Sequence, residues 1–551
     1  MQPNTEYFRT KYIRNNNQEK METNDGNKEM VSFIKLNDPF AILPFDITTI
    51  IIVFLPQAVR VECLQVSRLW RDYILACAEA WETLTFQNDK KDISLLPIRC
   101  TIGNYVKNLT IDTTSPTVCR TLLEELQYKR FKRIQSLTFN APETDLTIWK
   151  EGFDPQFQHH SLVNLEIDSK NITGEIIEPI LEQCQQLRRL VLRSCSISVL
   201  ETLVGTSTPN LELFCYNDGI DGSPLPMLQE KKKEDEALQQ QKGLRVIYTS
   251  YGETSVSPQA LLPLIYKNRE TLENLRGCMS DLPEAQIAVL HRRYPNFKLR
   301  NLKHLATWLG PGIQEFMMRV AIQNSNVLST LVVVGGYNLN LLLTALINRI
   351  PLSGLNISHV YLYHVTNDII QLLIQLFTHY AESSSNNTKS TSLNWIKLRY
   401  CDLVTDDVLK KLSDIKTLHD IHLGGLEYVS SVGILQFINK LGNQITHVFL
   451  HDMELVNDDI IIALGDLDNL LLVKLEVLDD VTDKGVRTLI DNKKRKLRRL
   501  TTLEITECPL ISQECISYAQ QNVKTVRYNS PFSEYYVTKA KDTYYVSRSS
   551  W

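Results

Sequence analysis

One short apolar pattern returns along most of this chain. From about residue 100 onward, segments of the form L-x-x-L-x-L recur roughly every 24–29 residues, and the segments 106–111, 134–139 and 162–167 start 28 residues apart. Each segment is predicted to be a short strand, and the residues after it read as a helix. A period of this length restricts the fold to an array in which each unit packs against its neighbours.

The period and the pattern resemble those of leucine-rich repeats of the strand-plus-helix type. The fold implied is α/β: a curved solenoid whose parallel strands line a concave face. A segment at 302–308 is too degenerate for its register to be assigned. The remaining units start at Leu187, Leu211, Leu244, Leu272, Leu328, Ile357, Leu393, Leu418, Ile445, Leu472 and Leu500.

Residues 43–84 predict two amphipathic helices ahead of the repeats. Pro44 suits the first turn of a helix, Asp46 favours the helix dipole there, and Pro56 ends the helix. The apolar stripe of the first helix, at helical spacing, contains Ile47, Ile50, Ile51, Phe54 and Leu55. The same spacing on the second helix joins Val59, Cys63, Val66 and Trp70. So small a unit cannot bury two apolar faces within itself, so the surplus face needs a partner.

This segment resembles the F-box. The resemblance rests on Leu43-Pro44, on the cluster Val66-Ser67-Arg68-x-Trp70 and on the later Trp81. It implies a helix cluster that binds the Skp-family adaptor of a cullin–RING (SCF-type) ubiquitin ligase. The adaptor-binding residues that it implies are Leu43, Pro44, Ile47, Ile51, Phe54, Leu55, Val66 and Trp70. The alternative for the same helices is an ordinary hairpin that caps the next domain.

Several repeat units carry a further local pattern after the strand. A cysteine ends the strand segment at Cys195, Cys401 and Cys508, and a Thr-Asp pair follows at 405–406 and 482–483. These units resemble the cysteine-containing repeats found behind F-boxes. The Thr-Asp pair is suited to cap the next helix, and the cysteines are predicted to be small buried side chains.

Composition excludes several classes of function. The chain has 551 residues, 43% of them hydrophobic, and a net charge of −4, whereas a nucleic-acid binder usually shows a basic stripe. The 11 cysteines include no CxxC pair, which favours reduced thiols and a cytoplasmic or nuclear protein. We expect no secretory signal and no membrane span, because the first 30 residues are polar and no apolar run approaches ~18 residues.

The domain boundaries follow composition and pattern. Residues 1–36 are rich in Asn, Glu and Lys and are predicted to be disordered. The F-box is assigned to 37–86 and the solenoid to 87–528, with insertions at 221–243 and 381–392. The tail 529–551 is rich in aromatic residues; it is a C-terminal cap, a strand lying in the concave face, or disordered.

The repeat pattern also predicts which side chains line the concave face. In L-x-x-L-x-L the leucines point into the core, so the residues on either side of the central leucines point into the concavity. The early units offer Asn164, Glu166 and Asp168, then Arg189, Val191 and Arg193. From 357 to 451 the face gathers aromatic, histidine and basic residues, the types that anchor interfaces. The predicted substrate-binding residues are His359, Tyr361, Tyr363, Trp395, Lys397, Arg399, His422, His447, Phe449 and His451.

These observations favour a binding protein over an enzyme. The chain contains no GxxxxGK[ST], HExxH or GxSxG motif, and neither a cofactor nor a metal site is expected. The pairs His359/His364 and His447/His451 lack metal-ligand spacing, and Lys397 with Arg399 make a weak case for phosphate recognition. The expected function is the substrate-recognition subunit of an SCF-type ubiquitin ligase, binding an adaptor and a protein substrate. The alternative is a non-degradative repeat scaffold or antagonist, without catalysis in either case.

Overall fold

The computed structural model describes residues 42–87, 102–115, 131–145, 161–216, 242–249, 256–309, 313–322, 327–334, 339–348, 352–360, 366–385, 393–496 and 500–529, except 132, 314 and 315. The chain divides into two compact units, Met1–Lys170 and Asn171–Trp551. The predictions for 1–36, for most of the insertion at 221–243 and for the tail from 530 lie outside the described residues. Among the described helices, none is long and apolar enough to cross a membrane.

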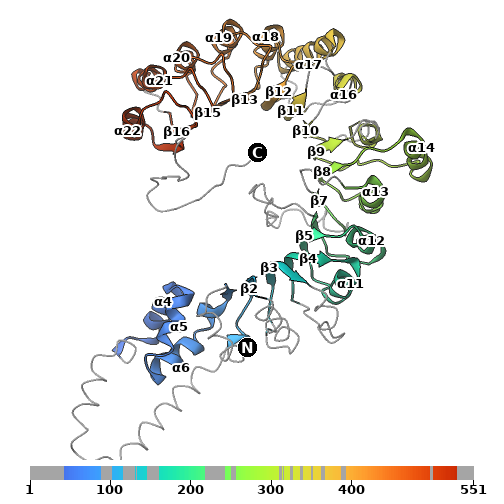
Figure 1. Cartoon of the computed structure of the whole chain (residues 1–551), viewed down its shortest axis with the longest axis vertical. Helices are drawn as coiled ribbons and strands as arrows, with labels where there is room; N and C mark the ends of the chain where they lie inside the picture. Colours follow the sequence, from blue (N-terminus) through green and yellow to red (C-terminus); the bar gives the residue numbers. More distant parts are fainter. Residues whose placement is uncertain are drawn as a thin grey trace, which may run out of the picture. The chain divides into compact units, whose positions relative to one another are not determined.

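Unit 1 joins a small helix cluster to the first strands of the repeat ladder (Figure 1). Its helices are α4 (Phe45–Phe54), α5 (Gln57–Cys63), α6 (Arg68–Ala76) and the 3-10 turn η3 (Ala78–Trp81). Its strands, which pair in parallel and in chain order, are β1 (Thr83–Phe86), β2 (Asn108–Asp112), β3 (Ser136–Asp145) and β4 (Asn164–Ile172), the last crossing the unit boundary. Because β1 pairs with β2, the segment predicted as F-box up to residue 86 already contains the first strand of the ladder.

The second predicted helix of this cluster is two helices. Ser67 has an extended backbone, and its hydroxyl accepts a hydrogen bond from the Trp70 N–H at 3.1 Å, which makes it the N-cap of α6. The break therefore separates Val59 and Cys63 on α5 from Trp70 on α6. An N-cap serine outweighs the continuous apolar spacing on which the prediction rested.

One side chain fastens the helix cluster to β1, and a second holds the cluster's own helices together. The Gln57 amide pairs with the backbone of Thr85, accepting its N–H at 2.9 Å and donating to its carbonyl at 2.5 Å. Trp81 is fully buried and donates to the Ile74 carbonyl at 2.8 Å. The Gln57 amide thus takes the place of a neighbouring strand at β1, which protects that backbone from other strands.

Unit 2 is a regular alternation of strands and helices. Its strands are β5 (Arg189–Cys195), β6 (Leu213–Tyr216), β7 (Val246–Thr249), β8 (Asn274–Met279), β9 (His304–Leu309), β10 (Thr330–Val334), β11 (Gly354–Val360), β12 (Trp395–Cys401), β13 (Asp420–Gly424), β14 (His447–His451), β15 (Leu472–Glu476), β16 (Thr502–Thr506) and β17 (Thr525–Asn529). Its helices are α11 (Gly174–Gln183), α12 (Ser198–Gly205), α13 (Pro258–Lys267), α14 (Glu284–Arg293), the π-helical turn η5 (Met318–Ile322), α16 (Leu339–Ile347), α17 (Asn367–Ser385), α18 (Asp406–Leu412), α19 (Ser431–Lys440), α20 (Asp458–Leu464), α21 (Asp483–Arg495) and α22 (Gln513–Asn522).

From β5 to β17, neighbouring strands of unit 2 pair in parallel. The strands lie on the inner side of this unit and the helices on its outer side (Figure 1). The repeat leucines are buried between the two layers, for example Leu398 and Leu450. The predicted α/β fold of leucine-rich strand–helix repeats is confirmed, and the segment at 302–308 corresponds to β9.

Two strands have a register that differs from the prediction. In β11 the buried positions aligned with the neighbouring strands are Leu355 and Ile357, not Val360 and Leu362. The segment 352–362 fits the leucine pattern twice, five residues apart, so only the pairing with β10 and β12 decides between the two. In β15 the buried pair is Val473 and Leu475, two residues before the predicted one.

Successive strands of unit 2 end in the same unusual conformation. The residue after the last aligned strand position has a positive φ at Tyr400 (48°), Gly425 (55°), Asp452 (49°), Val477 (54°) and Glu507 (51°). Such a φ is rare for residues other than glycine, and rarest for a β-branched residue such as Val477. In each of these repeats the bend turns the chain out of the sheet at the same strand position and toward the helix that follows.

Aspartates of successive helices connect neighbouring repeats. The Asp406 carboxylate accepts the N–H and the hydroxyl of Ser430 at 2.8 and 2.6 Å, and Asp458 holds Thr482 in the same way at 2.8 and 2.6 Å. Asp483 repeats the contact with Ser512. In the predicted Thr-Asp caps, the aspartate therefore bonds to the next repeat rather than to its own helix. Of the two threonines, only that at 482 caps its helix through the side chain.

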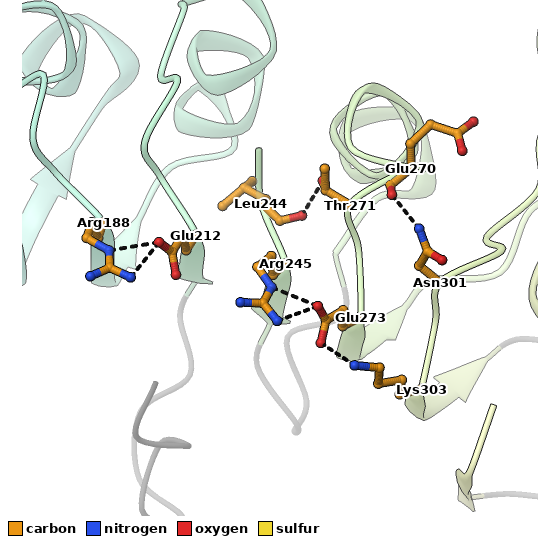
Figure 2. A network of polar contacts seen from close by, with 9 residues as sticks. All are labelled: Arg188, Glu212, Leu244, Arg245, Glu270, Thr271, Glu273, Asn301 and Lys303. Atoms are coloured by element: carbon orange, nitrogen blue, oxygen red, sulfur yellow. Dashed lines mark hydrogen bonds and ion pairs between the residues drawn. The ribbon is translucent and has the colours of Figure 1, made fainter. Parts of the chain in front are cut away.

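A second set of polar contacts lies at the N-terminal ends of the strands. Figure 2 shows Arg188 paired with Glu212, at 2.6 Å, and Glu273 held between Arg245 and Lys303. Each of these residues directly precedes a strand of β5–β9. The pairs are partly exposed to solvent, so each contributes little stability, but they align adjacent repeats.

Two smaller predictions concern the cysteines and the second insertion. Cys195, Cys401 and Cys508 are buried, and burial raises the pKa of the Cys401 thiol to about 12 and of Cys508 to about 11. Their expected packing role is confirmed. The insertion predicted at 381–392 starts later, because α17 continues to Ser385.

Candidate interaction sites

The helix cluster of unit 1 exposes an unusual amount of apolar surface. Of the 17 large hydrophobic side chains that are exposed among the described residues, nine fall between residues 42 and 66. Phe54 is 83% exposed, Ile42 63% and Val66 62%. We call these nine the apolar helix surface: Ile42, Phe45, Ile47, Ile50, Ile51, Val53, Phe54, Val59 and Val66. A concentration of this kind is typical of a protein interaction site.

Helix α4 buries few of its side chains against the rest of the cluster. Only Thr48 and Ile52 are buried on this helix, and α4 packs on η3. The Phe45 ring lies 5.9 Å from the ring of Tyr73 on α6. The predicted apolar stripe therefore faces away from the cluster, and the buried contact runs through a different pair of residues.

The eight predicted adaptor-binding residues are all accessible. Five are exposed and three are half-buried, the latter being Leu43, Leu55 and Trp70. Sequence reasoning missed Phe45, and it left Val53 out of the adaptor-binding set as part of a second apolar surface off the chosen stripe. Exposure leaves the adaptor assignment a prediction.

A second candidate site is the strand face of β12–β15 in unit 2. Pairing aligns Lys397 with His422, His422 with Phe449 and Phe449 with Lys474 in one row across four strands. Rows on either side of it complete the surface that we call the strand face: Trp395, Lys397, Arg399, Asp420, His422, His447, Phe449, His451, Lys474 and Glu476. These side chains are half-buried, and the leucine-type side chains between them are buried.

Flat rings occupy much of the strand face. The rings of His422 and Phe449 stack with centroids 3.7 Å apart and an angle of 19° between planes. The Trp395 indole lies against Gly354 of β11, where an added Cβ would be only 2.1 Å from the ring. Gly354 therefore provides the space that this indole needs, and any larger residue would displace it.

One end of the strand face carries a polar cluster. The Tyr400 hydroxyl lies 2.9 Å from His451 Nε2 and 3.1 Å from Asp452 Oδ2. Glu476 Oε2 lies 3.6 Å from His451 Nδ1 and accepts from Lys474 at 2.8 Å. Burial, followed by the hydrogen bond to Asp452, raises the pKa of Tyr400 to about 12, so this phenol stays protonated at neutral pH.

Two cations of the strand face lack an acidic partner. Lys474 is paired with Glu476, but among the described residues no carboxylate lies within ion-pair distance of Lys397 or Arg399. Burial, then Arg399 and Lys474, lower the pKa of Lys397 to about 8. Burial, then Lys397, lower the pKa of His422 to about 3, which leaves that imidazole neutral.

The structure brings together seven of the ten predicted substrate-binding residues. The predicted register of β11 put His359 on the face, but in the observed register it is the next-to-last residue of the strand and not an aligned face position. Tyr361 and Tyr363 lie outside the described residues. On β11 the aligned face positions are instead Gly354, Asn356 and Ser358. Sequence reasoning missed Lys474 and Glu476, because the predicted face extended only as far as residue 451; positions 474 and 476 lie on the face in the predicted register of β15 as well as in the observed one.

The early part of unit 2 differs from the prediction. Val191, expected on the concave face, is buried in a cluster with Leu213, Cys215 and Val246, against which Tyr248 packs. Strand β6 is buried at all four positions. The alternation of buried and exposed residues, on which the prediction depended, therefore fails in β5–β7 and holds in β12–β15.

Comparisons with known proteins give distant likenesses to solved structures. No protein-family model and no curated protein matches the chain. A crystal structure of the Rad7 and Elc1 complex in yeast is 12% identical, covers 94% of this chain and 96% of its own, and has a TM-score of 0.33. The TLR13–ssRNA13 complex is 11% identical, covers 78% and 63%, and has a TM-score of 0.35. Both TM-scores are below 0.5, so neither likeness supports a conclusion about function.

Proposed function

We propose that this protein is the substrate-recognition subunit of an SCF-type ubiquitin ligase. In this role the helix cluster of unit 1 binds a Skp-family adaptor, and the repeats of unit 2 bind a protein substrate. The protein itself transfers no ubiquitin; it brings a substrate lysine near the conjugating enzyme by raising the local concentration. It acts in the cytoplasm, the nucleus or both.

The apolar helix surface is the observation that carries the proposal. Contact of side chains such as Phe54 and Ile51 with water raises the free energy by about 25 cal/mol for each Å² of exposed apolar area. The cluster is already fastened to β1 through Gln57 and held together by Trp81, so these outer side chains are not needed for either contact. A partner that covers them would recover the cost, and the F-box resemblance of residues 43–70 names the adaptor as that partner.

The alternative is a scaffold without degradation, in which the helices only cap the repeats. The contact between Gln57 and Thr85 favours a capping role, because it covers the backbone of the first strand. A cap, however, needs only an inner apolar side. The exposed outer side of α4 is the feature that capping alone leaves unexplained.

The test is co-purification of the full chain with a Skp-family adaptor. We expect Phe54→Asp to lower adaptor affinity by at least about 100-fold, because it places a charge in an apolar contact. Val432→Asp on α19 is the matched control, since Val432 is 61% exposed in unit 2. Loss of binding in the first variant alone supports the proposal. A wild-type chain that fails to bind the adaptor leaves the capping scaffold as the function.

A further inference from the structure

We infer that the strand face binds an acidic segment of a protein partner, with Lys397 and Arg399 pairing with its carboxylates. This inference deepens the proposed function, on which it rests, by assigning the chemical class of the substrate segment. It stands on three observations about described residues: two cations without acidic partners, flat rings beside them, and a surrounding charge pattern that limits the ligand's charge.

Lys397 and Arg399 are available to a ligand, because neither forms an ion pair with a described residue of the strand face. Lys397 and Arg399 are on the same strand, two residues apart, and therefore point to the same side of the sheet. In the other charged pairs of this face, the basic and acidic groups are already matched: Asp420 with His447, and Lys474 with Glu476. A half-buried ammonium next to another cation is unfavourable, so an incoming carboxylate relieves repulsion as well as forming a pair.

The rings indicate a protein ligand. Trp395 lies at one side of Lys397, and the stacked rings of His422 and Phe449 lie on the following strands. Such surfaces accept apolar or aromatic side chains, and the combination of Trp, aromatic and Arg is typical of protein interfaces. A nucleic acid is disfavoured, because the chain has a net charge of −4 and acidic groups are interspersed on this face.

The neighbouring acids favour carboxylates over phosphates. Glu476 lies close enough to Lys397 and Arg399 to attract both electrostatically, and Asp452 accepts a hydrogen bond from Tyr400 at the end of the face. Two unmatched positive charges therefore face a partly negative rim. Singly charged carboxylates match this pattern, whereas a dianionic phosphate would meet stronger repulsion from the rim.

The groups that surround Lys397 determine how binding depends on pH. A bound carboxylate raises the pKa of Lys397 above its value of about 8 in the free protein. The contribution of this lysine to binding is thus complete below pH 8 and is lost as the pH rises through the bound-state value. The described charged and titratable groups that face it are Arg399 and Tyr400 on β12, Asp420 and His422 on β13, His447 and His451 on β14, and Lys474 and Glu476 on β15.

The experiment measures binding of the full chain to a short fluorescein-labelled peptide of glutamate and tyrosine residues. Fluorescence anisotropy is followed with wild type, with Lys397→Gln/Arg399→Gln, and with Lys410→Gln/Lys416→Gln, which removes the same charge from exposed positions outside the strand face. We expect the first pair to weaken binding about 100-fold and the control pair less than about threefold. Equal weakening by both pairs would overturn the inference.

Two further measurements separate the inference from misfolding and from other ligands. Glu476→Gln removes a negative charge and frees Lys474, so it should tighten binding severalfold, a gain that a damaged fold cannot produce. Wild-type binding should weaken about tenfold between pH 7 and pH 10, and Lys397→Gln should show little of this change. No tightening in Glu476→Gln, or an unchanged pH profile in Lys397→Gln, contradicts the inference.

Competing probes identify the ligand class. A peptide with glutamine in place of glutamate should not bind, and a phosphoserine peptide or a short oligothymidylate should bind no tighter than the glutamate peptide. Tighter binding of either would overturn the assignment to carboxylates. Adaptor binding is measured on the same preparations: a chain that binds adaptor but not the acidic peptide refutes this inference alone, whereas the reverse refutes only the proposed function.

Discussion

Two isoleucine-rich helices of this protein have opposite surroundings. Helix α4 contains Ile50-Ile51-Ile52 and α20 contains Ile460-Ile461-Ile462, and each has an acidic first turn. In α20, Ile460 and Ile461 are buried, whereas in α4 only Ile52 is buried. Helix α20 packs between α19 and α21, while α4 has its main contact with η3. Similar composition therefore produces core packing in one helix and a free surface in the other, because the number of neighbours decides.

The helix starts differ in the same way. Asn457 caps α20 by accepting from the N–H groups of Asp459 and Ile460, and Asp458 extends to the next repeat. Pro44 precedes α4 without any side-chain cap. A repeat helix is thus fixed at its end and on both sides, whereas α4 is held by one side. We expect substitutions in α20 to act on stability and those in α4 to act on binding.

The largest expected stability difference is between Ile461→Ala and Ile51→Ala. Removing the buried Ile461 side chain should cost about 2–5 kcal/mol, because it leaves a cavity between packed helices. The exposed Ile51 should cost less than about 0.5 kcal/mol. Hydrogen exchange of the α20 and α4 amides measures both local opening free energies, and equal losses would invalidate the comparison.

A smaller effect is expected for the bond between repeats. Asp458→Ala should cost about 1–3 kcal/mol, because Thr482 then loses the acceptor of its N–H and hydroxyl. Asp459→Ala is the matched control: Asp459 is exposed in the same turn, and we expect a change below about 0.5 kcal/mol. Thermal unfolding of the two variants compares them directly, and an equal shift would mean that the aspartate acts only through the helix dipole.

The smallest effect sharpens the comparison for α4. Ile50→Ser removes an apolar side chain that is 52% exposed, so the stability should change by less than about 0.5 kcal/mol. Adaptor affinity, by contrast, should fall a few-fold, because Ile50 belongs to the apolar helix surface; an unchanged affinity would limit the contact to the predicted adaptor-binding residues such as Ile47, Ile51 and Phe54. Titration calorimetry with the adaptor distinguishes these results.

The repeat fold was predictable because leucine spacing directly encodes which side chains are buried. Register was predictable only where the pattern fits once; the segment 352–362 fits it twice, and there the pairing of β11 with β12 decides. That error placed His359 on the strand face, whereas the register error in β15 left Lys474 at a face position. Local caps were harder to foresee, since Ser67 divides a continuous apolar spacing into two helices.

The direction of an apolar face could not be predicted either. Helical spacing identifies the stripe of Ile47, Ile51 and Phe54, but not whether it faces the chain or a partner. Likewise, the alternation rule predicts an exposed Val191, while the structure buries it. In both cases the outcome depends on which elements pack nearby, and a pattern within one segment contains no information about them.

The bend that recurs at the ends of β12–β15 keeps the rows of the strand face level. Tyr400, Gly425, Asp452 and Val477 turn the chain at one level, so the rows stay aligned across the strands. Hydrogen-bonded strands lie about 4.8 Å apart, so Lys397 and Lys474, three strands apart in one row, are separated by about 14 Å. An extended peptide laid across the strands advances about 3.4 Å per residue, so four residues span about the same distance. Such a chain with an acidic residue i at Lys397 would place residue i+4 at Lys474, which Glu476 already neutralises, so the face favours an acid at i and a neutral side chain at i+4.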